Sequence, residues 1–440
     1  MAGQFDNIHP SLSFEKALGI LATPEEDLDL SSDYYMAVCH LLNFPGDRTE
    51  DALLNIASNE SDTQAIRLAR RKSLEILGRL GCSKALPVLA RCLDDSDPYL
   101  VENAVWSLLQ IGSNDPEVHQ RLMDLLVENQ SNQRIIIQCL AGLDVQEAVD
   151  VIQQCLKSPT DSVRTAAGSA LCRLTGDRGY LDALEPLLFS VSQMDRQMVI
   201  EDLADCGGIE LLDSILKSPV SPVFRLRFVQ AVLPPLETSL TAKWNLLDVL
   251  DQILTDSPDS LLLRQTLDKE MSISEYLEGL FSNDFARCYQ CLLYLSGVDG
   301  SKLGPLLLQQ WNDRAFNDYG AHYFFVRLIG LVSSWPDDII STLEKLLLEA
   351  VDNLRPQFSK SRPAALLSLL DLSSKQLSSH FLIDILESSN SSWQLQYAAL
   401  MVAEQLPERE QLILHQHLGA EGHLSAAHAY VRKKLSRVLA

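Results

Sequence analysis

Long apolar runs, basic residues and glycine are all scarce in this chain, and each shortage excludes a class of protein. No apolar stretch approaches the roughly 20 residues that a membrane-spanning helix needs, so we expect no membrane insertion. The 36 Lys and Arg stand against 59 Asp and Glu, and the resulting net charge of −23 argues against nucleic acid as a partner. With only 20 glycines and with 46% apolar residues, the 440-residue chain is expected to fold around a large core.

The N-terminal segment MAGQFDNIHP has neither the basic nor the apolar region of a signal peptide, which predicts a cytoplasmic protein. The nine cysteines lie mostly inside helical patterns, so we interpret them as reduced, buried thiols. Cys288 and Cys291 have the spacing of a redox motif, but they fall within one helical pattern and have no strand before them.

The clearest positive signal is a repeat of about 31 residues in the first half of the chain. Successive amphipathic segments end at this spacing, namely Arg70–Gly81, Glu102–Gly112, Arg134–Asp144, Arg164–Thr175 and Arg196–Gly207. Such a unit cannot bury its apolar stripe alone, so it stacks on its neighbours and builds a long curved surface. The sequence therefore predicts an all-α fold, a right-handed α-solenoid (superhelix) of HEAT-like helix pairs.

We expect three regions along this solenoid. Residues 1–62 form an N-terminal helical cap, residues 63–235 carry the regular HEAT-like repeats, and residues 236–440 continue the same solenoid with irregular helical repeats. The cap contains a helical hairpin, Asp33–Asn43 and Thr49–Ala57, broken by the turn-forming Pro45 and Gly46.

The segment Pro98–Gly112 carries unusual side chains opposite its apolar stripe. At about 100° per residue, one face holds Val101, Ala104, Val105 and Leu108, and the other holds Tyr99, Glu102, Asn103, Trp106 and Gln110. Large aromatic side chains beside a carboxylate and an amide, away from the core, indicate a binding surface on the concave side. The alternative is that Trp106 packs on a neighbouring helix.

Basic residues occupy the equivalent positions of adjacent repeats. Arg71 matches Glu102, Arg134 follows one repeat later, and Arg67 lies one turn below Arg71. These side chains form either an Arg–Glu–Arg ladder that ties repeats together, worth ~0–1 kcal/mol per exposed pair, or a cationic patch that binds a carboxylate ligand.

These residues carry a resemblance to a known family. The string YLVENAVW over residues 99–106, the preceding RRK at 70–72 and the opening DYYMA…HLLNFP over 33–45 are similar to the E/F-type phycobilin lyases of cyanobacteria. Length and N-terminus most resemble the branch of phycoerythrin-specific lyases and lyase-isomerases. The match is specific over residues 30–115 and looser beyond; generic HEAT repeats share the leucine and glycine positions but not the YLVENAVW string.

The resemblance implies covalent chemistry on a bound chromophore. Such enzymes hold phycoerythrobilin, an open-chain tetrapyrrole substrate, and present it to a cysteine of a phycoerythrin α subunit, which adds across the ring A ethylidene to form a thioether. The thiolate comes from the client protein, so no catalytic cysteine, cofactor or metal is expected in the lyase. By this resemblance, Arg67, Arg71 and Arg134 would bind the propionates, and Glu102 would bind the pyrrole N–H groups. Tyr99 and Trp106 would pack against the flat rings, and Asn103 lies on the same face.

Isomerising members of the family also move a double bond of the bilin and convert it to phycourobilin, which needs a positioned acid–base pair. The densest candidate group is Asp318, Tyr319 and His322, in the irregular half. The alternative for Asp318 is an N-cap for the helix that follows.

A helical repeat of this composition is also compatible with two other classes of function. A non-catalytic HEAT-repeat scaffold or chaperone, binding a partner in an acidic groove, explains the repeats and the acidity equally well, but not the aromatic and polar face. A HEAT-type di-iron hydroxylase needs several His-Glu pairs, and no His in the chain is followed by Glu.

Overall fold

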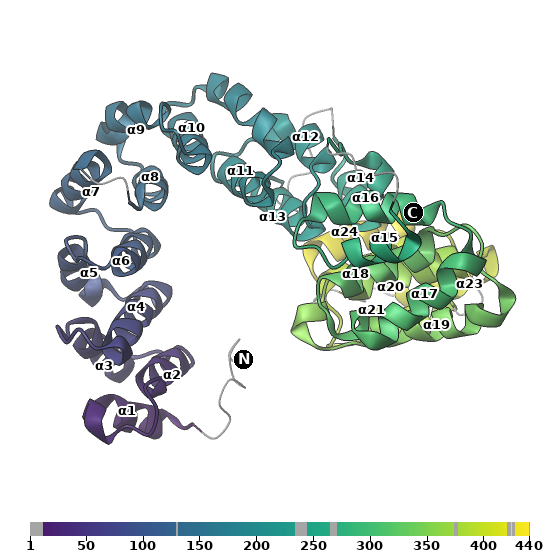
Figure 1. Cartoon of the computed structure of the whole chain (residues 1–440), viewed down its shortest axis with the longest axis horizontal. Helices are drawn as coiled ribbons and strands as arrows, with labels where there is room; N and C mark the ends of the chain where they lie inside the picture. Colours follow the sequence, from purple (N-terminus) through teal and green to yellow (C-terminus); the bar gives the residue numbers. More distant parts are fainter. Residues whose placement is uncertain are drawn as a thin grey trace. The chain divides into compact units, whose positions relative to one another are not determined.

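The computed structural model describes residues 12–128, 131–233, 244–264, 271–373, 377–419, 424 and 427–439. Within these ranges every regular element is a helix, so the predicted all-α fold is confirmed (Figure 1). The chain divides into two compact units, Met1–Ala183 and Leu184–Ala440, which we call unit 1 and unit 2. Across the described ranges, no helix is both long and apolar enough to cross a membrane.

Unit 1 is a solenoid of two rows of helices. Helices α2, α4, α6, α8 and α10 pack on one another in sequence order, and α3, α5, α7 and α9 each pack on the following member of that row. Figure 1 shows the even-numbered row along the inner side of the curve that unit 1 makes. The bounds are α1 Phe14–Ala22, α2 Asp33–Leu41, α3 Asp47–Ala57, α4 Gln64–Arg79, α5 Leu86–Cys92, α6 Pro98–Ile111, α7 Pro116–Glu128, α8 Gln133–Gly142, α9 Val149–Cys155 and α10 Asp161–Thr175.

The ends of these helices follow local chemistry. The Asp97 side chain accepts the Tyr99 N–H at 3.0 Å and caps α6, and Thr63 accepts the Ile66 N–H and caps α4. Gly112 ends α6 in the left-handed region, at φ 79°. The predicted helices of the repeats are confirmed, but α4 begins earlier than the predicted Arg70, because its cap at Thr63 and not the apolar period sets its first turn.

Adjacent repeats approach closely where a glycine faces a small residue. A Cβ added to Gly78 of α4 would lie 2.6 Å from Ser107 Oγ of α6, and that hydroxyl donates to the Leu74 carbonyl at 2.8 Å. The spacing of α4 and α6, which positions the face of α6 described below, therefore depends on the absence of a side chain at Gly78.

Unit 2 contains a second row, α16, α18, α20, α22 and α24, whose members also pack in sequence order. Helix α14 contacts α20, α22 and α24, which lie far from it in the sequence. The bounds are α11 Gln193–Asp205, α12 Leu212–Lys217, α13 Pro222–Val232, α14 Leu246–Thr255, α15 Ile273–Gly279, α16 Phe285–Ser296, α17 Gly300–Asp313, α18 Ala321–Leu331, α19 Asp337–Val351, α20 Ser361–Leu372, α21 Ser379–Glu387, α22 Trp393–Ala403, α23 Glu408–Leu418 and α24 Ala429–Val438.

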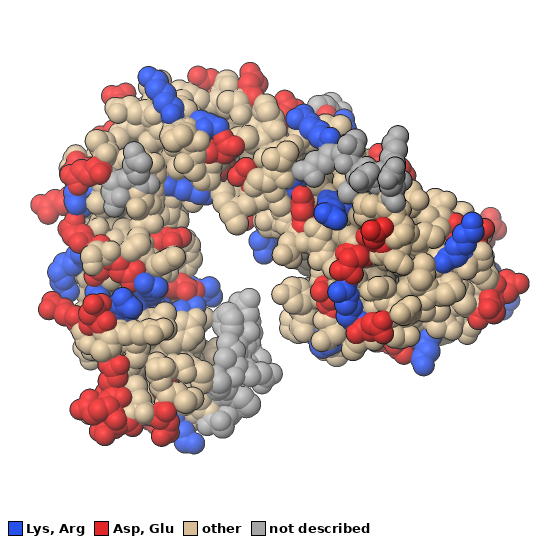
Figure 2. All heavy atoms as spheres, in the orientation of Figure 1, with Lys and Arg blue, Asp and Glu red and all other residues tan. Residues whose placement is uncertain are grey.

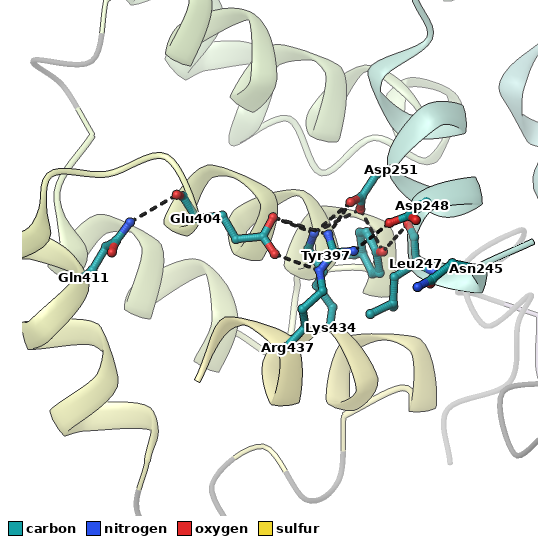
Figure 3. A network of polar contacts seen from close by, with 9 residues as sticks. All are labelled: Asn245, Leu247, Asp248, Asp251, Tyr397, Glu404, Gln411, Lys434 and Arg437. Atoms are coloured by element: carbon teal, nitrogen blue, oxygen red, sulfur yellow. Dashed lines mark hydrogen bonds and ion pairs between the residues drawn. The ribbon is translucent and has the colours of Figure 1, made fainter. Parts of the chain in front are cut away.

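A charged network fastens the C-terminal helix to α14 (Figure 3). The buried Lys434 Nζ donates to Asp251 Oδ2 at 3.0 Å and to Glu404 Oε2 at 2.7 Å. Arg437, which lies on the same helix as Lys434, donates to Asp248 of α14. The Tyr397 hydroxyl donates to Asp251 Oδ1 at 2.9 Å. The contacts of Lys434 with Asp251 and of Arg437 with Asp248 join residues more than 180 positions apart in the chain, whereas the units of a simple solenoid contact only their neighbours. The predicted boundary between residues 235 and 236 lies in 234–243, outside the described residues, and stays a prediction.

Candidate functional site

The exposed face of α6 is the first part of the candidate site. Tyr99 is 59% exposed, Glu102 is exposed, and Asn103 and Trp106 are partly exposed. The opposite stripe of α6 is buried. Because α6 belongs to the inner row of unit 1, these four side chains lie on the concave side, and Trp106 is not part of the core. Asn103 Nδ2 donates to the Tyr99 carbonyl at 2.7 Å.

Arg71 stands beside this face. Its Nε donates to Asp97 Oδ2 at 2.6 Å and its Nη2 to Asp97 Oδ1 at 2.8 Å, and its guanidinium lies 4.7 Å from the centre of the Tyr99 ring. Burial raises the pKa of Asp97, but the Arg71 bonds and backbone N–H groups outweigh it, so that the pKa lies below its ordinary value. The sequence analysis did not anticipate the ion pair of Asp97 with Arg71.

The Arg–Glu–Arg ladder, one of the two interpretations of these residues, does not form among the described residues. Arg71 pairs with Asp97, and Glu102 makes no ion pair with any residue that the structure describes. Arg134 Nη1 donates to the Ser162 carbonyl at 2.9 Å and to Thr165 Oγ1 at 3.4 Å. Arg67 is exposed and lies 3.8 Å from Asp62.

The Arg134 side chain lines an open cleft of about 510 Å³. The cleft lies between α7, α8, α9 and the start of α10, and its polar wall includes Lys157, Ser158, Thr160 and Ser162. In unit 1, Lys and Arg side chains also gather around α4, interspersed with Asp and Glu (Figure 2). Basic groups for an anionic ligand are therefore available on two of the repeats of unit 1.

The second predicted group, in unit 2, separates into two environments. Asp318 Oδ1 accepts the Gly320 N–H at 2.9 Å and the Ala321 N–H at 2.8 Å, which caps the start of α18. Tyr319 is 66% exposed, whereas His322 is 2% exposed. The structure thus brings Asp318 and Tyr319 together at the surface and turns His322 into the core.

The surroundings of His322 are aromatic. Its ring lies 4.9 Å from Trp311 and 4.7 Å from Phe358, and its Nδ1 is buried without a hydrogen-bond partner among the described residues. Burial lowers the pKa of His322 to about 4, assisted by the positive charges of Arg355 and Lys360. The imidazole is consequently neutral near pH 7.

Unit 2 also contains a buried polar cluster that sequence reasoning missed. Asp256 accepts hydrogen bonds from Arg225, from the Tyr289 hydroxyl at 2.7 Å and from the Tyr323 hydroxyl. Burial, together with the Asp256 charge, raises the pKa of Tyr289 and of Tyr323. Arg225 and Asp256 are 31 residues apart and Asp256 and Tyr289 are 33 apart, so the repeat period could have grouped them.

Comparisons with known proteins find a family model, relatives and a solved structure that are similar to this chain. A model of HEAT repeats matches residues 50–134. The bilin biosynthesis protein CpeY of Synechococcus sp. (strain WH8020) is 36% identical over 384 residues, which cover 87% of this chain and 91% of that protein. The phycocyanobilin lyase subunit alpha of Nostoc sp. (strain PCC 7120) is 27% identical over 280 residues, 58% of this chain and all of that protein. A solved structure, the complex of CpcE and CpcF of phycocyanin lyase from Nostoc sp. PCC7120, matches at 25% identity and a TM-score of 0.48, and covers 60% of this chain and 100% of that one.

Proposed function

The chain belongs to the E/F-type phycobilin lyase family, and from that premise we propose that it attaches phycoerythrobilin through a thioether to a cysteine of a phycoerythrin α subunit. The observation that carries the proposal is the similarity to a bilin biosynthesis protein over 87% of the chain. This similarity extends far beyond the residues that match generic HEAT repeats.

The face of α6 offers the groups that an open-chain tetrapyrrole requires. Tyr99 and Trp106 supply aromatic surface for the rings, and Glu102, which has no ion pair with a described residue, supplies a carboxylate for the pyrrole N–H groups. Arg71 and Arg134 supply guanidinium groups for the two propionates, a match that favours bidentate bonds. On binding, Arg71 would release the Asp97 carboxylate and bind a propionate carboxylate of the bilin instead.

The bond-forming step uses a group that the client protein brings. The client thiolate adds to the exocyclic carbon of the ring A ethylidene, a C–S bond forms, the C=C π bond breaks, and the neighbouring ring carbon takes up a proton. The lyase contributes by holding the bilin in one orientation, so that the client thiolate and the ethylidene carbon meet in a reactive geometry.

Isomerisation to phycourobilin is a second candidate activity, favoured by the position of Asp318 and Tyr319. Both side chains are exposed at the start of α18, so they are accessible to a bilin held at that surface. His322 is enclosed in the core, and we assign the proton transfers to Asp318 and Tyr319 alone.

Co-expression tests both activities. The protein is produced with a phycoerythrobilin pathway and a phycoerythrin α subunit, and the absorbance of the purified, denatured subunit is recorded. A covalent band of phycoerythrobilin indicates a lyase, and a blue-shifted band of the phycourobilin type indicates a lyase-isomerase. No covalent colour on any α or β subunit would reject the lyase activity and favour a scaffold or chaperone.

A further inference from the structure

Unit 2 contains an apolar cavity of about 150 Å³ that is separate from the residues assigned above. It lies between α13, α14, α18, α20 and α22, and side chains of Pro222, Leu226, Ile253, Leu254, Pro363 and Ala364 form most of its wall. A cavity of roughly this size, when lined by apolar groups, accommodates a benzene-sized ligand. We call it the Lys360 pocket, after the one cationic residue among the described residues that line it.

Lys360 is unusual for a lysine because its ammonium group is held against aromatic rings. Nζ lies 4.9 Å from the centre of the Phe285 ring and 5.3 Å from that of Tyr323. Burial lowers the pKa of Lys360. Among the described residues, Lys360 makes no ion pair and no hydrogen bond through Nζ.

The charges of two carboxylates, Asp256 and Asp318, act on Lys360, and the buried one of the two is already hydrogen-bonded to other side chains. Asp256 lies beneath the pocket wall, because the Tyr323 hydroxyl bonds to it. Its oxygens also accept from Arg225 and Tyr289, and Asp256 is only 1% exposed. Asp256 is therefore already engaged with three other side chains, and Lys360 lines an apolar wall without an ion pair to a described carboxylate. A partly desolvated cation in this position favours an anionic ligand group.

We propose that the Lys360 pocket binds one apolar ring or branched chain that carries a carboxylate a few bonds away, with the carboxylate on Lys360 Nζ. The apolar wall accounts for the ring and Lys360 for the charge. The half-buried side-chain amide of Gln394 also lines the pocket, and it can donate to the second carboxylate oxygen. The inference does not depend on bilin attachment. Two sources share this chemistry: a pyrrole ring with its propionate, and an apolar side chain beside an acidic one on a polypeptide.

The test uses 3-phenylpropionate as the probe on the full chain. Ligand-observed NMR or calorimetry measures its affinity, and 3-phenylpropanamide serves as a neutral ligand of the same shape. We expect the acid to bind roughly tenfold to a hundredfold more tightly than the amide, because a charge-assisted bond contributes that ratio. Equal binding of acid and amide by the unmodified protein would overturn the proposal without any variant.

Variants then locate the binding. Lys360→Gln should remove the preference for the acid, and Ala364→Leu should abolish binding of both ligands because it fills the cavity. Lys302→Gln, a change at an exposed lysine of α17, is the matched control and should leave both affinities unchanged. Retention of the acid preference in Lys360→Gln would overturn the assignment.

Competition identifies the source of the acid. Displacement of the probe by biliverdin but not by its dimethyl ester assigns the pocket to a tetrapyrrole propionate, and displacement by a phycobiliprotein α subunit without chromophore assigns it to a polypeptide. Because the probe experiment needs no client and no covalent product, its failure is distinguishable from a failure of the lyase activity.

Discussion

Arg71 holds Asp97 with two parallel hydrogen bonds, from Nε at 2.6 Å and from Nη2 at 2.8 Å. This geometry is the one that a guanidinium also uses for a ligand carboxylate. Asp97 therefore occupies the groups that we assign to a bilin propionate, and the two carboxylates must compete for Arg71.

Asp97→Asn should raise the affinity for phycoerythrobilin about fivefold. Removal of a competing, partly exposed ion pair is worth ~1 kcal/mol, and Asn keeps the cap of α6. Absorbance titration with phycoerythrobilin measures the effect. Asp95→Asn is the control, because Asp95 pairs with Arg70 and its loss should leave the affinity unchanged. A lower affinity of Asp97→Asn for phycoerythrobilin would show that the Arg71–Asp97 ion pair serves only to order the repeat.

Arg71→Glu and Arg134→Glu should each weaken the retention of bilin roughly tenfold to a hundredfold. A charge-assisted bond to a propionate contributes ~1.5–3 kcal/mol, and the substitution also adds repulsion. Helical circular dichroism should remain intact. Arg91→Glu, at an exposed position of α5 in the outer row, provides the control. If both variants retain bilin like the unmodified protein, the two arginines serve structure alone.

Asp318→Asn and Tyr319→Phe should keep the fold and bilin binding yet lose 10²–10⁴-fold of turnover, an approximate range typical of general acid–base groups. Asn at position 318 can still accept the Gly320 and Ala321 N–H groups, so this change separates catalysis from capping. Asp318→Ala should in addition lower the thermal midpoint, because loss of a cap costs about 1 kcal/mol. Product formed by Asp318→Asn at the unmodified rate would return this segment to a structural role and direct the search for the acid to Glu102.

His322 should make the protein less stable as the pH falls. Its pKa is about 4 in the folded state and near 6.5 when unfolded, so between these values the unfolded state binds more protons. Stability is full above pH 6.5 and decreases by about 1.4 kcal/mol per pH unit toward pH 4, roughly 3 kcal/mol in total. Below pH 4 the contribution is constant.

Urea unfolding between about pH 7 and about pH 4.5 measures this slope. His322→Phe, which suits the contacts with Trp311 and Phe358, should flatten it. His380→Phe, at an exposed position, should retain it. An unchanged slope in His322→Phe would assign the acid sensitivity to other groups.

The candidate site shows which side-chain positions can be predicted from sequence periodicity and which cannot. The 3.6-residue period placed Tyr99, Glu102, Asn103 and Trp106 on one face of α6, and the structure has them there because the opposite stripe is buried. The density of titratable residues grouped Asp318, Tyr319 and His322 in one segment, but it could not assign the directions of their side chains. Asp318 and Tyr319 precede the first full turn of α18, whereas His322 is already inside it.

The sequence could not identify the ion-pair partners, and the reason is different. Arg71 has acidic neighbours one repeat away at Asp97 and at Glu102, and the choice depends on which carboxylate lies in the plane of its guanidinium. Close packing of α4 on α6 at Gly78 and Ser107 fixes that geometry.

By itself the sequence determined the all-α repeat, the amphipathic faces and the family, because a stripe that recurs at a fixed period allows only stacked helices, and the string at residues 99–106 is specific. Tertiary structure alone decided which charges meet. Lys434 and Asp251 are 183 residues apart, and Arg225, Asp256, Tyr289 and Tyr323 converge from four separate segments. Contacts at such separations follow from how helices pack in three dimensions, and the Lys360 pocket, enclosed by five of those helices, exists only in the folded chain.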